Sequence, residues 1–218
     1  MTPRASGAEP ERPLILIVDD DAGIRHALQN LLRSVGLDAV CFASTRELLA
    51  ANLQDRPGCM ILDVRLPGLS GLDLQRHLAS DGNAKPIVFL TGHGDIQMTV
   101  QAMKAGAVDF LTKPVRDQAL LDAVATGIER DIARRAVLQA ARQHACRFET
   151  LTPRERQVMR GVVRGRLNKQ IAFDLGISVV TVKLHRSHAM RKMRAGSVGD
   201  LIRAWESLPV PMRDRETP

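Results

Sequence analysis

The sequence predicts an α/β domain with a five-stranded parallel sheet, followed by a small domain made only of helices. Three observations lead to this fold class. Short apolar runs alternate with helix-like segments through the first 130 residues, the rest of the chain shows only helical periodicity, and the two parts carry opposite net charge. The length of 218 residues suits two small domains.

Five short, continuous apolar runs predict buried parallel strands. They are Leu14–Val18, Ala39–Phe42, Cys59–Leu62, Pro86–Leu90 and Val108–Leu111. A segment with helical spacing follows each run. These segments are Ile24–Leu32, Thr45–Leu53, Leu72–Leu78, Ile96–Ala105 and the residues from Val115 onward. Because the strands lack a polar face, we expect helices on both faces of the sheet, as in a doubly wound fold.

Polar side chains stand at the carboxyl ends of four predicted strands, the edge where open parallel sheets bind ligands. They are Asp19, Asp20, Asp21, Asp63, Thr91 and Lys113. We interpret Asp21 as the N-cap of the next helix, which leaves Asp19 and Asp20 as an acidic pair. Clustered carboxylates suit Mg²⁺. A carboxylate beside that ion, with an ammonium and a hydroxyl nearby, has the groups needed to accept a phosphoryl group.

Four segments in order, LIVDDD, ILDVRLPGLSG, FLTGHGD and AMKAGAVDFLTKP, resemble the receiver domain of two-component response regulators, and the FixJ branch in particular. The resemblance covers residues 13–130 and implies a flavodoxin-like sheet. It implies that Asp63 is the phosphoacceptor, that Thr91 and Lys113 hold phosphoryl oxygens, and that Phe110 changes rotamer on phosphorylation. The implied Mg²⁺ ligands are Asp19, Asp20, Asp63 and the backbone carbonyl of Arg65. A plain core role is the alternative for Phe110.

Two alternative architectures with an enzymatic activity can be compared with this sequence pattern. A Mg²⁺-dependent phosphohydrolase on a similar sheet would use Asp63 as nucleophile, but it needs a second acid–base aspartate where this chain has Arg65. A regulator with an inserted ATPase domain would need a GxxxxGKS loop, which the short linker does not contain. We therefore expect no enzyme, only phosphoryl acceptance and at most slow autodephosphorylation.

The segment from Gln118 to about Arg147 contains no proline and predicts one long helix. Its residues 131–147 would link the two domains. Apolar residues recur along it at helical spacing, namely Leu121, Val124, Ile128 and Ile132. This stripe could pair with a second copy as a short coiled coil or pack against its own receiver, and the spacing favours neither.

Charge separates the two parts of the chain. Residues 1–130 hold 13 Lys+Arg and 16 Asp+Glu, a net −3, whereas residues 131–218 hold 18 and 8, a net +10. A basic half beside an acidic half indicates that the C-terminal part meets a polyanion, most simply nucleic acid. A basic domain that is merely soluble is the alternative.

Helix signals divide the C-terminal part into four helices. Thr152 and Glu155 form a capping box with Pro153 between them, and Gly165 ends this first helix. The second helix covers Asn168–Leu175 and ends at Gly176. The third and fourth begin after Ser178 and Ser197 and reach Met193 and Trp205. Two helices joined by a tight turn containing glycine are typical of a helix-turn-helix, whose second helix enters the major groove.

The third of these helices has two distinct faces. Val182, Ala189 and Met193 share one side. The residues expected on the outward side are Val180, Lys183, Leu184, Ser187 and Arg191. The segment LTPRERQVMRGVVRGRLNKQIAFDLGISVVTVKLHRSHAMRKM resembles the LuxR-type helix-turn-helix of FixJ- and NarL-like regulators over residues 148–208. The resemblance implies base contacts from Lys183, Leu184 and Ser187. It implies phosphate contacts from Asn168, Lys169, Thr181, His185 and Arg191.

These features together predict a two-component response regulator that controls transcription. We expect it to take phosphate from a sensor histidine kinase, to form a homodimer on phosphorylation, and to act with RNA polymerase at promoter DNA. An RNA-binding antiterminator shares the receiver but lacks this recognition-helix pattern.

The remaining sequence features concern location and the chain ends. No apolar run approaches the roughly 18–20 residues of a membrane span, and the first residues lack the apolar stretch of a signal peptide. The three cysteines are far apart and in no CxxC arrangement. We therefore expect a cytoplasmic protein without a membrane partner. Residues 1–12 and 209–218 are expected to be disordered tails.

Overall fold

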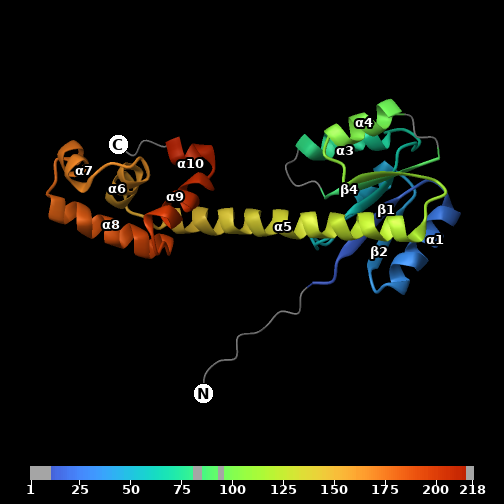
Figure 1. Cartoon of the computed structure of the whole chain (residues 1–218), viewed down its shortest axis with the longest axis horizontal. Coiled ribbons are helices and arrows are strands. Elements are labelled where there is room, and N and C mark those ends of the chain that lie inside the picture. Colours follow the sequence, from blue (N-terminus) through green and yellow to red (C-terminus); the bar gives the residue numbers. More distant parts are fainter. Residues whose placement is uncertain (1–10, 81–84, 93–95, 215–218) are drawn as a thin grey trace, which may run out of the picture. The chain divides into compact units, whose positions relative to one another are not determined.

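The computed structural model describes residues 11–80, 85–92 and 96–214 (Figure 1). The chain forms two compact units that divide between Arg135 and Ala136. The first ten residues of the expected N-terminal tail, and residues 93–95 of the GHGD motif, lie outside the described residues.

The N-terminal unit is built around a five-stranded parallel sheet with strand order β2-β1-β3-β4-β5. Its elements in chain order are β1 (Leu14–Val18), α1 (Ala22–Ser34), β2 (Asp38–Phe42), α2 (Thr45–Ala50), β3 (Met60–Asp63), α3 (Gly71–Ser80), β4 (Ile87–Thr91), α4 (Ile96–Lys104), β5 (Asp109–Thr112) and α5 (Asp117–Glu149). This arrangement confirms the predicted fold class.

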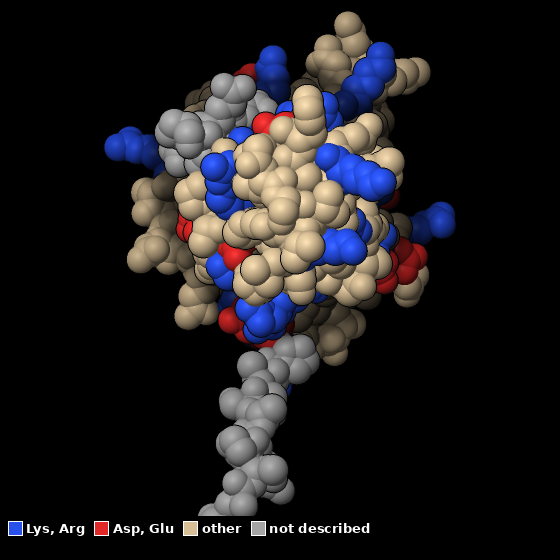
Figure 2. Space-filling model, turned by 90° about the vertical axis from the view of Figure 1, so that its left-hand side faces the viewer, with Lys and Arg blue, Asp and Glu red and all other residues tan. Residues whose placement is uncertain are grey.

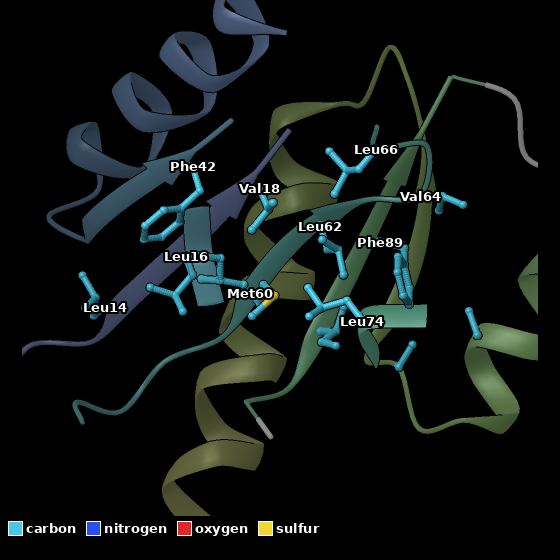
Figure 3. Packing of buried hydrophobic residues seen from close by; sticks show 14 residues of the cluster. Leu14, Leu16, Val18, Phe42, Met60, Leu62, Val64, Leu66, Leu74 and Phe89 are labelled. Atoms are coloured by element: carbon cyan, nitrogen blue, oxygen red, sulfur yellow. The ribbon is translucent and has the colours of Figure 1, made fainter. Parts of the chain in front are cut away.

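Side chains of each strand alternate between two apolar layers, since successive residues point to opposite faces of a sheet. Leu16 and Val18 of β1 belong to the layer covered by α2, α3 and α4, where Leu62, Leu74 and Phe89 also lie (Figure 3). Ile15 and Ile17 belong to the opposite layer, which α1 and α5 cover. Both layers are buried, so the strands need the fully apolar pattern seen in the sequence.

Three strands, β3, β4 and β5, extend one residue further toward the ligand edge than predicted. Asp63 pairs with Leu90 as the last residue of β3, and Thr91 pairs with Thr112 as the last residue of β4. Both polar side chains were expected to follow their strands. The ladder of backbone hydrogen bonds to the neighbouring strand sets these ends, and that ladder is not visible in local sequence patterns.

Helix α5 begins on the N-terminal unit and is held there beyond its first turns. Asp131 has a fully buried side chain that accepts hydrogen bonds from the backbone N–H of Gly58 at 3.0 Å, from Arg134 at 2.6 Å and from Arg135 at 2.8 Å. Residues of α5 up to Ile128 pack on the sheet, whereas Ile132 is 50% exposed. The first part of α5 therefore packs against its own receiver. Pairing of the later part with a second copy stays a prediction.

The C-terminal unit is a small helical domain. Its elements after α5 are α6 (Pro153–Val163), α7 (Asn168–Leu175), α8 (Val179–Met193), α9 (Val198–Glu206) and α10 (Val210–Asp214). The predicted capping box of α6 is present, with Thr152 N–H donating to Glu155 at 2.8 Å and Glu155 N–H donating to the Thr152 hydroxyl at 3.3 Å. Ser178 and Ser197 cap α8 and α9 as expected. Gly176 ends α7 in the left-handed conformation, with φ of 63°.

One expectation for this domain was wrong. Residues 209–218 were expected to be a disordered tail, but α10 lies within them, so the domain has one helix more than the four predicted. Met212 of α10 packs against the domain core, which stabilises a helix too short to form alone. Five residues are also too few to show a helical period in the sequence. Residues 215–218 lie outside the described part of the chain.

Candidate phosphorylation site and nucleic-acid interface

Three aspartates meet at the carboxyl edge of the sheet. Asp19 follows β1 and is 1% exposed, Asp63 ends β3 and is 6% exposed, and Asp20 is exposed. One carboxylate oxygen from each lies within 4.8 Å of the others. Asp19 and Asp63 are 44 positions apart in the sequence, and the parallel sheet brings them together because all its strands end at this edge.

Lys113 joins two of these carboxylates. Its Nζ donates to Asp19 Oδ2 at 2.6 Å and to Asp63 Oδ2 at 2.7 Å. Burial raises the pKa of Asp19 above its ordinary value, and the hydrogen bond from Lys113 only partly offsets this effect. Burial alone would lower the pKa of Lys113, but its hydrogen bonds to the two carboxylates outweigh burial and raise that pKa. The ammonium therefore stays charged between the two acids.

Backbone N–H groups bind the second oxygen atom of the same two carboxylates. Asp19 Oδ1 accepts from the backbone N–H of Asp21 at 3.0 Å, and Asp63 Oδ1 accepts from that of Arg65 at 3.0 Å. Asp21 itself caps α1, as predicted, by accepting from the N–H of Gly23 at 2.7 Å. These contacts fix both carboxylates at the edge of the sheet.

Two residues that sequence reasoning did not include in the site also shape it. Arg25 Nη1 donates to the carbonyl of Asp19 at 2.7 Å and so holds the loop after β1. Gly71 begins α3 so close to β3 that a Cβ there would lie 2.4 Å from the carbonyl of Asp63. Helical spacing places Arg25 on α1 but does not show which loop it reaches, and the segment that contains Gly71 does not show how closely α3 approaches β3.

The hydroxyl and aromatic residues of the predicted site lie on adjacent strands. Thr91 is fully buried at the end of β4, and its carbonyl accepts from Lys113 N–H at 2.7 Å. Phe110 on β5 is half-buried, and its ring centroid lies 6.0 Å from that of Phe89. Phe110 thus touches the core without being enclosed by it.

The three carboxylates have the donor chemistry that a hard divalent cation requires. Asp19, Asp20 and Asp63 supply oxygen ligands only, and the ammonium of Lys113 together with the nearby guanidinium of Arg25 still leaves an excess of negative charge. Mg²⁺ takes one or a few carboxylate ligands and keeps water on its other positions. These residues fit such an ion.

The faces of α8 agree with those predicted from its spacing. Val182, Ala189 and Met193 are at most 1% exposed and belong to the domain core. All five residues expected to point outward are exposed, namely Val180, Lys183, Leu184, Ser187 and Arg191. Figure 2 faces the side of this unit on which α7 lies, and Lys and Arg are spread over it with fewer acidic groups among them.

The residues for which phosphate contacts are predicted lie on α7 and α8. Asn168 and Lys169 form the first turn of α7, Thr181 is in the first turn of α8, and His185 is half-buried one turn later. The Thr181 hydroxyl lies 2.8 Å from that of Ser178. The structure also connects the two helices through Arg186, which sequence reasoning did not include.

Two family models match the chain. The model of the response regulator receiver domain matches residues 15–125, and the model of bacterial regulatory proteins of the luxR family matches residues 149–205. The chain therefore belongs to the response regulators that join a receiver domain to a LuxR-type DNA-binding domain, and it is a transcriptional regulator of this class.

Relatives match over almost the whole chain. Nodulation protein W of Bradyrhizobium diazoefficiens is 50% identical over 98% of this chain and 95% of its own length. The response regulator protein TodT of Pseudomonas putida is 46% identical over 89% of this chain and 86% of its own.

Solved structures of response regulators also match both units. A low-resolution structure of the response regulator StyR has a TM-score of 0.76 at 45% identity, covering 89% of this chain and 98% of that one. Full-length FixJ from B. japonicum has a TM-score of 0.54 at 38% identity, covering 90% and 97%. Among the described residues, none of the helices is long and apolar enough to cross a membrane.

Proposed function

We propose that Asp63 is the phosphoacceptor of this regulator. The observation that carries the proposal is the convergence of Asp19, Asp20 and Asp63 within 4.8 Å, with Lys113 bonded to two of them. Asp63 sits at the end of β3 beside an exposed aspartate, so a donor can reach it from solvent. A buried acidic pair with a structural lysine alone would not need the third, exposed carboxylate.

We assign Mg²⁺ to the oxygens of Asp19, Asp20 and Asp63, together with the backbone carbonyl of Arg65. When bound, the ion would neutralise charge on the phosphoryl oxygens. The excess negative charge of the three carboxylates is the reason a cation is needed, because phosphorylation adds roughly −1.5 to −2 more charge at Asp63.

The chain's own residues would act as follows. A carboxylate oxygen of Asp63 attacks the phosphorus of a phosphohistidine on the kinase, the P–N bond breaks, and the imidazole leaves with that electron pair. Lys113 gives up its bond to Asp63 and pairs with a phosphoryl oxygen, and the Thr91 hydroxyl donates to another. Phe110 then changes rotamer toward the core beside Phe89. The protein is therefore a phosphoryl acceptor, with at most slow autodephosphorylation.

The C-terminal unit would bind promoter DNA with α8 in the major groove. Lys183 would contact guanine edges, Ser187 would contact either partner of a base pair, and Leu184 would contact a thymine methyl. Their exposure on one face, above a packed helical platform, supports this assignment. The phosphate contacts would come from Asn168, Lys169, Thr181, His185 and Arg191.

The partners follow from these two activities. A sensor histidine kinase would supply the phosphoryl group in the cytoplasm, and RNA polymerase would be the target at the promoter. Phosphorylation would favour a homodimer through the surface of α4, β5 and the start of α5. Ile96, Val100 and Met103 of α4 are exposed apolar residues, which supports self-association of this surface.

Intact-mass spectrometry after treatment with Mg²⁺ and acetyl phosphate tests the assignment of Asp63. The wild-type chain should gain the mass of one phosphoryl group, and Asp63→Asn should gain none, because asparagine lacks the nucleophilic charge. Asp122→Asn, an exposed change on α5, is the matched control and should behave like wild type. Equal phosphate on Asp63→Asn would refute the proposal.

A further inference from the structure

A hydrogen bond connects the two helices of the helix-turn-helix. Arg186 of α8 donates from Nη1 to Asn168 Oδ1, the side-chain oxygen of the first residue of α7, at 3.1 Å. Arg186 lies four residues after Val182 and three before Ala189, so it stands on the inward side of α8 and is half-buried. Its guanidinium therefore reaches α7, whereas Lys183 and Ser187, at neighbouring positions around the helix, are exposed.

This bond determines how the amide of Asn168 is oriented. A guanidinium has donors only, so it must face the oxygen of the amide and not its nitrogen. The two N–H groups of Asn168 then point away from Arg186. Asn168 has no other side-chain partner within the described residues, and its amide nitrogen remains available to an acceptor.

We infer that Arg186 is a positioning residue for DNA binding, which holds Asn168 with its amide N–H groups toward a phosphate oxygen. The inference rests on the proposed phosphate contact of Asn168. It assigns to Arg186 the contact with Asn168, and no contact of its own with a base or a phosphate. The effect should be independent of base sequence, since phosphates carry no direct sequence information.

The test compares four variants of the full chain, namely Arg186→Met, Arg186→Gln, Asn168→Ala and the Asn168→Ala/Arg186→Met pair. Glutamine keeps a donor without the charge, and methionine fills similar space without a donor. Affinity is measured against log salt on two duplexes, one selected from a random pool by the wild-type protein and one unrelated.

Arg186→Met should weaken binding to both duplexes about 3- to 10-fold, the net effect of roughly one hydrogen bond. Arg186→Gln should retain most of the wild-type affinity, because glutamine keeps a donor. The salt slope should not change, because no phosphate-bound cation is lost. The double variant should bind like Asn168→Ala alone. Arg203→Met, at an exposed side chain of α9, is the control for removing one positive charge from this domain.

Three results would overturn the inference. Equal losses for Arg186→Met and Arg186→Gln, with a salt slope lower by about one, would show that Arg186 contacts a phosphate itself. If Arg186→Met binds DNA with unchanged affinity, or if the losses of the two single variants simply add in the double variant, Arg186 does not act through Asn168 in DNA binding. If Asn168→Ala loses no affinity for DNA, the proposed phosphate contact of Asn168 is refuted, and the inference about Arg186 that rests on it fails with it. Trp205 fluorescence checks folding, and Arg186→Leu replaces the methionine variant if that variant unfolds.

Discussion

Replacement of Asp131 tests how firmly the interdomain helix is held to the receiver. The carboxylate is fully buried and accepts four hydrogen bonds, one from the backbone N–H of Gly58 in the loop before β3, two from Arg134 and one from Arg135 of α5 itself. The Nζ atom of Lys85 lies 3.9 Å away. Asp131→Ala leaves the donor groups of these neighbours without their shared acceptor.

The expected cost is near the lower end of the range for breaking a buried ion pair, about 3 kcal/mol. The lower end applies because the side chains of Arg134 and Arg135 are 25% and 22% exposed and can be partly solvated after the change. Asp131→Asn keeps one acceptor and should cost about half as much. For a domain of this size, 3 kcal/mol corresponds to a fall in Tm of roughly 10 °C.

Two probes separate the receiver from the DNA-binding domain in thermal unfolding. The chain contains one tryptophan and no tyrosine, and Trp205 packs edge-on against Phe148 in the C-terminal unit, so its fluorescence reports that unit. Far-UV circular dichroism reports both units. Asp131→Ala should lower the receiver transition and leave the Trp205 transition unchanged, and the exposed control Asp122→Ala should leave both unchanged.

The pH dependence gives an independent check of the same carboxylate. Burial alone would raise the pKa of Asp131, but hydrogen bonds from Arg135, Arg134 and Gly58 outweigh it and hold the pKa below the ordinary 3.8. A depressed pKa contributes stability above pH 3.8, and this contribution is lost as pH falls through the folded pKa. The deficit of Asp131→Ala should persist from pH 7 to about pH 4 and shrink below. A cost under about 1 kcal/mol at pH 7, or equal shifts of both transitions, would refute the reasoning.

Three further predictions concern the recognition helix α8, the dimer and the stability of the DNA-binding domain. Lys183→Ala should cost about 1–3 kcal/mol on the preferred duplex and flatten discrimination at one or two base pairs, whereas Arg191→Ala should weaken all duplexes and lower the salt slope by about one. Equal losses from Lys183→Ala on every sequence would reassign it to the backbone. Analytical ultracentrifugation should find more dimer after phosphorylation, and an unchanged monomer–dimer constant would contradict the dimer route. Glu155→Gln should lower the temperature of the transition reported by Trp205, because it weakens the 2.7 Å hydrogen bond from Lys192. Burial would raise the pKa of Glu155, but the hydrogen bonds from Lys192 and the Thr152 N–H outweigh burial and lower it. The loss of stability in Glu155→Gln should therefore shrink below about pH 4.5.

The sequence by itself determined the alternation of buried strands and helices and the helix starts of the C-terminal domain. These features depend on local chemistry. A strand buried on both faces must be apolar throughout, and a helix N-terminus needs a side chain such as Thr152 or Ser197 to satisfy its free N–H groups. The meeting of Asp19 with Asp63 also followed from sequence, because parallel strands present their carboxyl ends at one edge.

Only the tertiary structure decided what lies opposite each helix face. Helical spacing placed Val182, Ala189 and Met193 on the inward side of α8, but only the packing of α7 shows that Arg186 lies 3.1 Å from Asn168. Asp131 looks like any solvent-facing acid of a charged helix, and its partner Gly58 is 73 positions away. Such contacts join residues that are distant in sequence, and a pattern read along one segment contains no information about a second segment. The physical reason is that the packing of segments against each other, and not the periodicity within one segment, determines which residues come into contact.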